Sequence, residues 1–180
     1  TPFAMRFREA NVDEVKAVLR VHRLAFGQDD EAILVDALLQ DPSAQPSLSV
    51  VAETKGEVAG HALFTALTLV GSKTPINCSI LAPLAVLPTH QRSGIGRGLI
   101  EYGCNLLATR GIDLVFVLGD RLYYTRYGFT PAAPYGLHAR YAIEPEEAWM
   151  VRPLRPHVLG TAHGTVRCAQ ALAAEQYWRE

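Results

Sequence analysis

The sequence has few cysteines, no long apolar run and no excess of basic residues. Its three cysteines, Cys78, Cys104 and Cys168, form no C-x-x-C pair and no Cys/His cluster at metal-ligand spacing. We therefore expect reduced, structural thiols and no metal site. No stretch approaches the roughly 20 apolar residues that a membrane-spanning helix needs. The 17 basic and 18 acidic residues give a formal net charge of -1, so we expect neither a membrane nor nucleic acid as a partner.

The composition is that of a folded chain. Hydrophobic residues make up 49% of the 180 residues, which excludes wholesale disorder and fits one domain over residues 1–180. The amino end has neither the basic region nor the apolar region of a secretory signal. A cytoplasmic location is the expectation that follows.

The first part of the chain predicts two helices and a hairpin. Asn11 and Glu14 have capping-box spacing and precede apolar residues that recur every three or four positions. This spacing is typical of an amphipathic helix. A proline at position 42 cannot continue a helix. The expected elements are a strand at 5–8, a helix that ends at Gly27, a second helix from Asp29 or Asp30 to Asp41, and a hairpin of strands 48–53 and 58–70.

Residues 80–118 predict a parallel crossover. The apolar run 80–87 reads as a buried strand in which Pro83 marks a bulge or a place where pairing ends. A helical rhythm begins at Ile95, Gly111 ends it, and the run 114–118 is apolar at every position. A strand that is apolar on both faces suits the centre of a sheet covered by helices on both sides. We therefore predict an α/β (α+β) fold.

The last third of the chain gives weaker signals. Gly128 ends a short predicted helix, and Pro131, Pro134 and Pro145 punctuate a loop-rich stretch. The remaining expected elements are a helix at 121–127, strands that begin at Phe129 and at Trp149, an edge strand at 164–168 and a terminal helix at 169–177.

The sharpest local motif lies between the apolar strand and the helix. Its sequence is Gln91-Arg92-Ser93-Gly94-Ile95-Gly96-Arg97-Gly98. Each glycine in a helical position costs about 1 kcal/mol relative to alanine, so folding alone does not favour three of them here. Unpaired amides at a helix start, with no Cβ to block approach, can bind a phosphate or diphosphate. The alternative is a plain glycine-rich connection with two solvated arginines.

Two common nucleotide motifs do not match this segment. The dinucleotide fingerprint needs G-x-G-x-x-G after a first strand, whereas the chain has G-x-G-x-G past its midpoint. A Walker A loop needs a lysine, and the only lysines are Lys16, Lys55 and Lys73.

The segment resembles the acetyl-CoA signature Q/R-x-x-G-x-G/A of the GNAT N-acetyltransferases, with Gln91 or Arg92 at its start. The stretches 84–88, 119–120 and 123–129, together with 60–64, are similar to the YhbS-like bacterial branch of that family. The resemblance extends from about Gly60 to Phe129. It implies a GNAT fold, a mixed central sheet whose parallel fourth and fifth strands splay apart, flanked by helices.

The resemblance also implies a cofactor, acetyl-CoA, without a metal. Its binding core would cover residues 80–129, with the pantetheine arm in the gap between the splayed strands and the diphosphate on the glycine turn. The residues it assigns to acetyl-CoA are Leu84, Ala85, Val86, Gln91, Arg92, Ser93, Gly94, Ile95, Gly96 and Arg97.

The same resemblance implies that Tyr124 is the general acid that protonates the leaving thiolate, while Tyr123 or Tyr127 packs in the core. A free amine must lose a proton before it attacks. The candidates for the base are His61, Asp120, Glu53 or water, and each of the three side chains also has a structural reading. In structural terms, His61 would be a half-buried strand residue, Asp120 a helix cap and Glu53 a strand-end charge. Attack is expected to be direct.

The acceptor pocket of this family is built by the first two helices and their connection. Here that connection holds Phe26, Gln28, Asp29, Asp30 and Glu31, whose acids either draw a cationic amine or cap the second helix. The loop 132–142, with several aromatic side chains, is expected to form the other wall or a homodimer contact.

These observations favour an enzyme that transfers the acetyl group of acetyl-CoA to a primary amine of a small molecule or peptide. Because no base is singled out, a non-catalytic acyl-CoA-binding sensor or interaction module is the alternative. A nucleotide-phosphate binder of another fold is a third interpretation.

Overall fold

The computed structural model describes residues 5–179. Its strands form a nine-stranded sheet in the order β1-β2-β3-β4-β5-β8-β6, and β9 pairs with both β3 and β7. The β4–β5 and β7–β9 pairs are parallel, while the other pairs are antiparallel. The strands are β1 Arg6–Glu9, β2 Leu48–Thr54, β3 Glu57–Val70, β4 Cys78–Val86, β5 Leu114–Leu118, β6 Thr130–Pro131, β7 Leu137–His138, β8 Trp149–Pro153 and β9 Gly164–Arg167.

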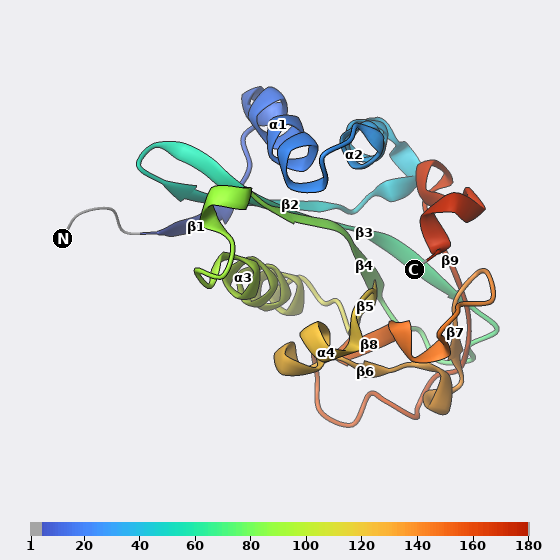
Figure 1. Ribbon diagram of the computed structural model, residues 1–180. Helices are drawn as coiled ribbons and strands as arrows, with labels where there is room; N and C mark the ends of the chain where they lie inside the picture. Colours follow the sequence, from blue (N-terminus) through green and yellow to red (C-terminus); the bar gives the residue numbers. More distant parts are fainter. Residues whose placement is uncertain (1–4, 180) are drawn as a thin grey trace.

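Helices cover both faces of this sheet. Figure 1 shows α1 and α2 on one face and α3 and α4 on the other. This mixed sheet with its parallel central pair confirms the predicted α+β class. The helices are α1 Val15–Phe26, α2 Asp30–Gln40, α3 Ile95–Thr109 and α4 Arg121–Tyr124.

The starts and stops of the first two helices follow the sequence signals. The Asn11 amide donates to Glu14 Oε1 at 2.7 Å, as a capping box requires. Gly27 ends α1 with a φ of 67°, and its amide donates to the Arg23 carbonyl at 2.9 Å. α2 ends at Gln40, with Asp41 as its C-cap directly before Pro42. Asp29 is the N-cap residue of α2, as predicted, but its side chain makes no capping hydrogen bond.

The crossover β4, α3 and β5 has the predicted form. Residues Leu114–Val117 are buried on β5. The Phe116 ring stacks on Trp149 of β8, with ring centroids 5.0 Å apart. Both faces of this central strand are therefore covered, which explains its uninterrupted apolar sequence.

The carboxyl end of the chain differs from the prediction. Two short 3-10 segments, Gln170–Leu172 and Glu175–Trp178, replace the expected helix over 169–177. The buried Trp178 indole N–H donates to the Leu172 carbonyl at 2.8 Å, and the Ala171 amide donates to Asp41 at 2.9 Å. The first bond closes the segment on itself, and the second holds it beside the end of α2. Together they override its local helical preference.

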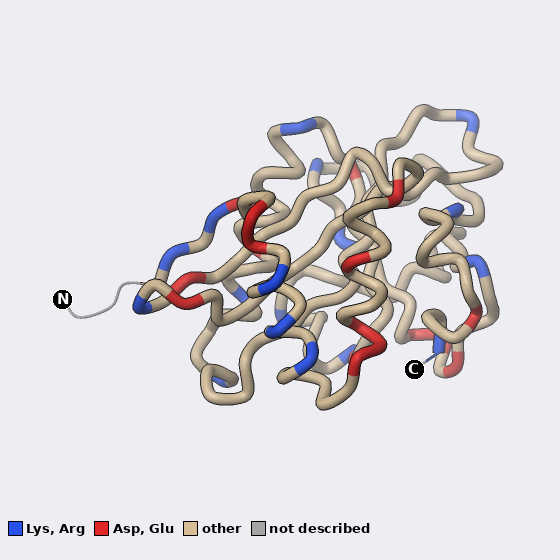
Figure 2. Tube along the Cα trace, turned by 90° about the horizontal axis from the view of Figure 1, so that it is seen from above, with Lys and Arg blue, Asp and Glu red and all other residues tan. Residues whose placement is uncertain are grey.

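Charges are interspersed along the trace. Figure 2 shows Lys and Arg residues scattered along the trace, with Asp and Glu residues among them, as expected from the nearly balanced composition. Within residues 5–179, no helix is both long and apolar enough to cross a membrane.

Candidate active site

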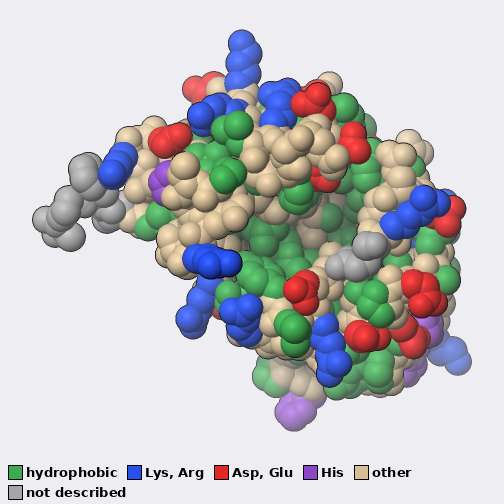
Figure 3. Space-filling view, viewed as in Figure 1, with side chains coloured by type: hydrophobic (Ala, Val, Ile, Leu, Met, Phe, Trp, Pro, Cys, Tyr) green, Lys and Arg blue, Asp and Glu red, His purple; other side chains and the backbone are tan. Residues whose placement is uncertain are grey.

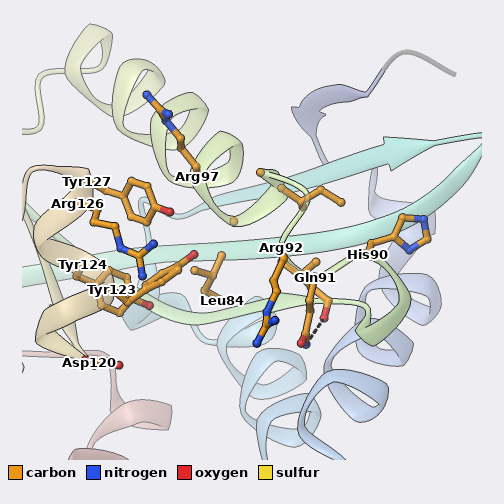
Figure 4. A pocket seen from close by; sticks show the side chains of 14 residues that line it. Leu84, His90, Gln91, Arg92, Arg97, Asp120, Tyr123, Tyr124, Arg126 and Tyr127 are labelled. Carbon is orange, nitrogen blue, oxygen red and sulfur yellow. Dashed lines mark hydrogen bonds between the residues drawn. The ribbon is translucent and has the colours of Figure 1, made fainter.

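A cavity of about 800 Å³ lies between the end of β4, the start of α3 and α4. Figure 4 shows its side chains, which come from these three elements and the loops that join them. Nine of the residues, including three tyrosines, are polar or charged, so the cavity suits a ligand with both apolar and anionic parts. The lining residues are Leu84, Val86, His90, Gln91, Arg92, Gly94, Ile95, Gly96, Arg97, Asp120, Tyr123, Tyr124, Arg126 and Tyr127.

The cavity exists because β4 leaves β5. Parallel pairing between the two strands covers only Cys78–Ile80 and Leu114–Phe116, so the last part of β4 pairs with β3 alone. The register with β3 shifts at residues 82 and 83 of β4, where the sequence placed the bulge of Pro83. Backbone groups of Leu84 on the β5 side therefore face the opening without a strand partner.

The start of α3 offers free backbone amides. Its first intrahelical hydrogen bond runs from the Gly98 amide to the Gly94 carbonyl at 3.0 Å. The amides of Ile95, Gly96 and Arg97 come before that bond and have no acceptor within the helix. Gly94 has a φ of 86°, a backbone conformation that favours glycine. The amides and the positive end of the helix together suit an anion.

The other two glycines of the motif have different neighbours. A Cβ on Gly96 would lie 2.3 Å from the Tyr123 hydroxyl oxygen, so glycine here lets that tyrosine approach the helix start. A Cβ on Gly98 would lie 2.0 Å from the Phe7 ring of β1. Gly98 therefore serves packing against the sheet, and only Gly94 and Gly96 line the cavity.

Three arginines surround the cavity, but they point in different directions. In Figure 4, Arg92 and Arg126 lie on opposite sides of Leu84, whereas the Arg97 side chain extends along α3 away from it. The Arg126 guanidinium lies 5.7 Å from the centre of the Tyr123 ring. Arg92 and Arg126 can add positive charge to the anion-binding amides, and Arg97 offers chiefly its backbone.

Tyrosines form the wall opposite α3. The Tyr123 ring packs edge-on against both Tyr124 and Tyr127, with centroid separations of 4.9 and 5.1 Å. Burial and the neighbouring Tyr127 raise the pKa of Tyr123. Tyr123 and Tyr127 pack against the core, as predicted for one of them, and both also line the cavity together with Tyr124.

A second cavity of about 500 Å³ lies between the α1–α2 connection, the bulge of β4 and the carboxyl end of the chain. Leu84 and Tyr124 line it, and among the described residues no others line both cavities. Figure 3 shows a hollow in this face of the molecule, with hydrophobic side chains on its floor and charged ones on its rim. Two ligands, one bound in each cavity, would meet at Leu84 and Tyr124.

The sequence predicted one wall of the second cavity but not the other. Phe26, Gln28, Asp30 and Glu31 line it as expected, whereas Asp29 forms an ion pair with Arg23 at 3.4 Å. The loop 132–142 does not line it, and that prediction is wrong, since the loop borders a separate cavity of about 320 Å³. Residues missed by the sequence analysis form the other wall: Leu172, Gln176, Tyr177 and Arg179.

Two of the residues predicted to contact acetyl-CoA do not line the first cavity. Ala85 is buried where β4 pairs with His61 of β3. The Ser93 hydroxyl donates to the His90 carbonyl and thereby shapes the turn before α3. Gln91 lines the cavity, and its side-chain amide donates to the Val86 carbonyl at 3.3 Å.

The carboxylate candidates for a general base have structural partners. Asp120 accepts a hydrogen bond from the Leu122 amide at 2.8 Å, as the capping interpretation predicted, although it also lines the first cavity. Glu53 accepts from Arg8 at 3.0 Å. Arg8 also pairs with Glu14 at 2.7 Å, so Glu53 belongs to an ion-pair cluster at the strand end and lines neither cavity.

His61 is fully buried, which corrects the expectation of a half-buried residue. Its Nδ1 lies 2.8 Å from Nε2 of His22 on α1, and its Nε2 lies 2.7 Å from the Ser49 hydroxyl. Burial lowers the pKa of His22 to about 4, and burial together with His22 lowers the pKa of His61. This pair could not be predicted, because helical spacing places His22 on the inward face of the first helix without indicating its partner on another element.

The thiols agree with the expectation of structural cysteines. All three cysteines are free. Burial raises the pKa of Cys78 and that of Cys104 to about 12, so neither thiol supplies a thiolate nucleophile. Residues 5–179 contain no group of three His, Cys, Asp or Glu side chains that could hold a metal ion.

Comparison with known proteins identifies the family. The family model for an acetyltransferase (GNAT) domain matches residues 6–132. The chain belongs to the GNAT acetyltransferase family. Its helix-start amides and its split sheet are therefore features of an acetyl-CoA-binding fold.

Similar GNAT proteins occur in Escherichia coli. The uncharacterized N-acetyltransferase YjhQ of strain K12 is 41% identical over 167 residues, which cover 91% of each chain. The uncharacterized N-acetyltransferase YhbS of the same strain is 32% identical over 144 residues, covering 80% of this chain and 84% of YhbS. The similarity to YhbS agrees with the branch suggested by residues 60–129.

Solved structures support the same fold. The crystal structure of Escherichia coli YhbS in complex with CoA has a TM-score of 0.87 at 28% identity, covering 97% of this chain and 94% of the other. A GNAT family acetyltransferase from Brucella melitensis in complex with acetyl-CoA has a TM-score of 0.73 at 28% identity, with coverages of 94% and 98%. The first of these structures contains bound CoA, and the second contains bound acetyl-CoA.

Proposed function

We propose that this protein transfers the acetyl group of acetyl-CoA directly to a primary amine of a small molecule or peptide. The observation that carries the proposal is the meeting of two cavities at Leu84 and Tyr124. One cavity lies at the start of α3, and the other lies beside the α1–α2 connection. Two substrates can therefore enter separately and react where the cavities join.

The proposed cofactor contacts follow from the first cavity. Amides of residues 95–97, with Arg92 and Arg126, would bind the diphosphate. Backbone groups of Leu84 and Val86 would bind the pantetheine arm, because β5 leaves that edge of β4 unpaired. Gly94 and Gly96 keep the approach free of side chains, while Ala85 and Ser93 support the strand and the turn.

The proposed chemistry needs three events at the junction. The amine nitrogen forms a bond to the thioester carbonyl carbon, and the carbon–sulfur bond then breaks. Water first accepts a proton from the substrate ammonium, so that the neutral amine attacks, and water accepts a second N–H proton from the tetrahedral adduct. Tyr124 donates its phenolic proton to the departing thiolate and then regains a proton from solvent. Water is the favoured acceptor because Glu53 is held by Arg8, Asp120 caps α4 and His61 is fully buried.

An amine screen tests this function. Purified protein is incubated with acetyl-CoA and pooled primary amines, while free thiol is followed and products heavier by one acetyl group are sought by mass spectrometry. We expect amine-dependent thiol release in the wild type. In the Tyr124→Phe variant we expect a loss of about 10²-fold in kcat with CoA affinity retained.

The screen also separates the enzyme from the alternative, a CoA-binding module without catalysis. Such a module would bind acetyl-CoA and stay silent against the whole library, and Tyr124→Phe would have no turnover to lose. A nucleotide binder would instead be stabilised against heat by ATP or NAD more than by CoA.

A further inference from the structure

Leu84 and Tyr124 bound the only junction that the described residues form between the two cavities. Under the proposed function, the thioester reaches this junction from the first cavity and the amine reaches it from the second. The reacting atoms must come within about 3.5 Å of one another. The acyl group itself therefore lies between these two side chains.

The tyrosine side of the junction is fixed. A Cβ on Gly119 would lie 2.4 Å from Cε2 of Tyr124, so the ring rests directly on that backbone. The ring also packs edge-on against Phe129, with centroids 5.6 Å apart, and against Tyr123. Contacts on three sides leave this aromatic wall little room to yield to a larger acyl group.

The leucine side is different. The backbone of Leu84 is anchored by its pairing with Ala62 on β3, but its side chain is partly exposed in the gap left by β5. In Figure 4 this side chain stands between the tyrosines and Arg92. Its isobutyl group therefore occupies space at the junction without being needed to hold the strand in place.

We propose that the Leu84 side chain is the specificity determinant that limits the transferred acyl group to acetyl. This inference rests on the proposed function, since it concerns the donor that the same site accepts. The acyl group has the rigid Tyr124 ring on one side and the Leu84 isobutyl group on the other. Shortening Leu84 to alanine removes three carbons and opens room for two or more methylenes of a longer chain.

The test compares acetyl-CoA, propionyl-CoA and butyryl-CoA with the wild type and Leu84→Ala. We expect the ratio of kcat/KM for butyryl-CoA to kcat/KM for acetyl-CoA to rise about tenfold or more in Leu84→Ala, because one methylene that fits or clashes in a pocket changes kcat/KM by about tenfold or more. Leu118→Ala is the matched control, since Leu118 lines the second cavity alone. It should change all three donors by a common factor and leave the ratio unaltered.

A binding readout keeps this proposal separate from the transferase proposal. Calorimetric titration of the three acyl-CoA species measures affinity without any acceptor. A selective gain in butyryl-CoA affinity in Leu84→Ala supports the assignment of Leu84 even if no amine is turned over. An unchanged ratio in both assays, or a wild type that accepts butyryl-CoA as well as acetyl-CoA, overturns it.

Discussion

Acidification should destabilise this protein through its buried histidine pair. His22 and His61 are fully buried and share a 2.8 Å hydrogen bond. The unfolded chain binds a proton on each imidazole below a pH of about 6.5, whereas the folded protein resists this because burial lowers the pKa of His22 to about 4. Folding stability is therefore complete above about pH 6.5 and falls as the pH drops toward 4.

The size of the effect follows from the pKa of His22. Between about pH 7.5 and about pH 5, a shift from 6.5 to about 4 removes about 2 kcal/mol from the free energy of unfolding. The full loss approaches about 3 kcal/mol at lower pH. His61 adds to it in the same direction, because its pKa is also lowered.

Carboxylates act in a lower pH window. Hydrogen bonds from Arg8 lower the pKa of Glu14, and those from Ser43 lower the pKa of Asp41. Their stabilising contribution is present above their unfolded pKa values of 4.5 and 3.8 and is lost as the pH falls below them. The histidine effect can therefore be measured largely apart from them.

The assay is urea unfolding at a series of pH values from about 7.5 to 5. The wild type should lose at least about 2 kcal/mol over this range. The double variant His22→Leu/His61→Leu removes both titrating groups together, so its stability should depend much less on pH. His138→Asn, at an exposed histidine, is the control and should keep the wild-type slope. An equal slope in the double variant and the wild type would refute the reasoning.

Three further predictions concern the site. Gly98→Ala should destabilise the protein by about 1–3 kcal/mol, since its Cβ would meet the Phe7 ring, and Phe7→Ala in the same chain should recover part of the melting temperature. Arg92→Ala should weaken CoA binding about tenfold at low salt and less at high salt, as titrations at two ionic strengths can show. In Gly96→Ala, the loss of CoA-binding free energy should exceed the loss of folding free energy, because the new Cβ crowds Tyr123 beside the helix start. Equal CoA affinity in this variant and the wild type would contradict the assignment of those amides.

The central part of the fold could be read from the sequence because its signals are local. The bulge at Pro83, the glycine turn and the apolar run of β5 each occupy a few consecutive residues, and the crossover rule joins them. The same locality explains why Gly94 and Gly96 could be placed at the cavity. Gly98 could not be separated from them, since its partner, Phe7, lies on a distant strand.

The second cavity depends on contacts that no local pattern encodes. Its far wall is the carboxyl end, docked on Asp41 and Ser43 more than 100 residues earlier in the chain. An alanine-rich stretch at 169–174 predicts helix by propensity, but docking enforces 3-10 turns. The pairing of His22 with His61 likewise requires α1 to pack on β3, which the sequence does not specify at the level of single side chains.

A crystal structure of the protein with acetyl-CoA tests the central claim most directly. We expect diphosphate oxygens within hydrogen-bond distance of the amides of residues 95–97, and the thioester between Leu84 and the Tyr124 hydroxyl. A diphosphate bound away from the start of α3, or a thioester that does not reach the junction of the two cavities, would contradict the account.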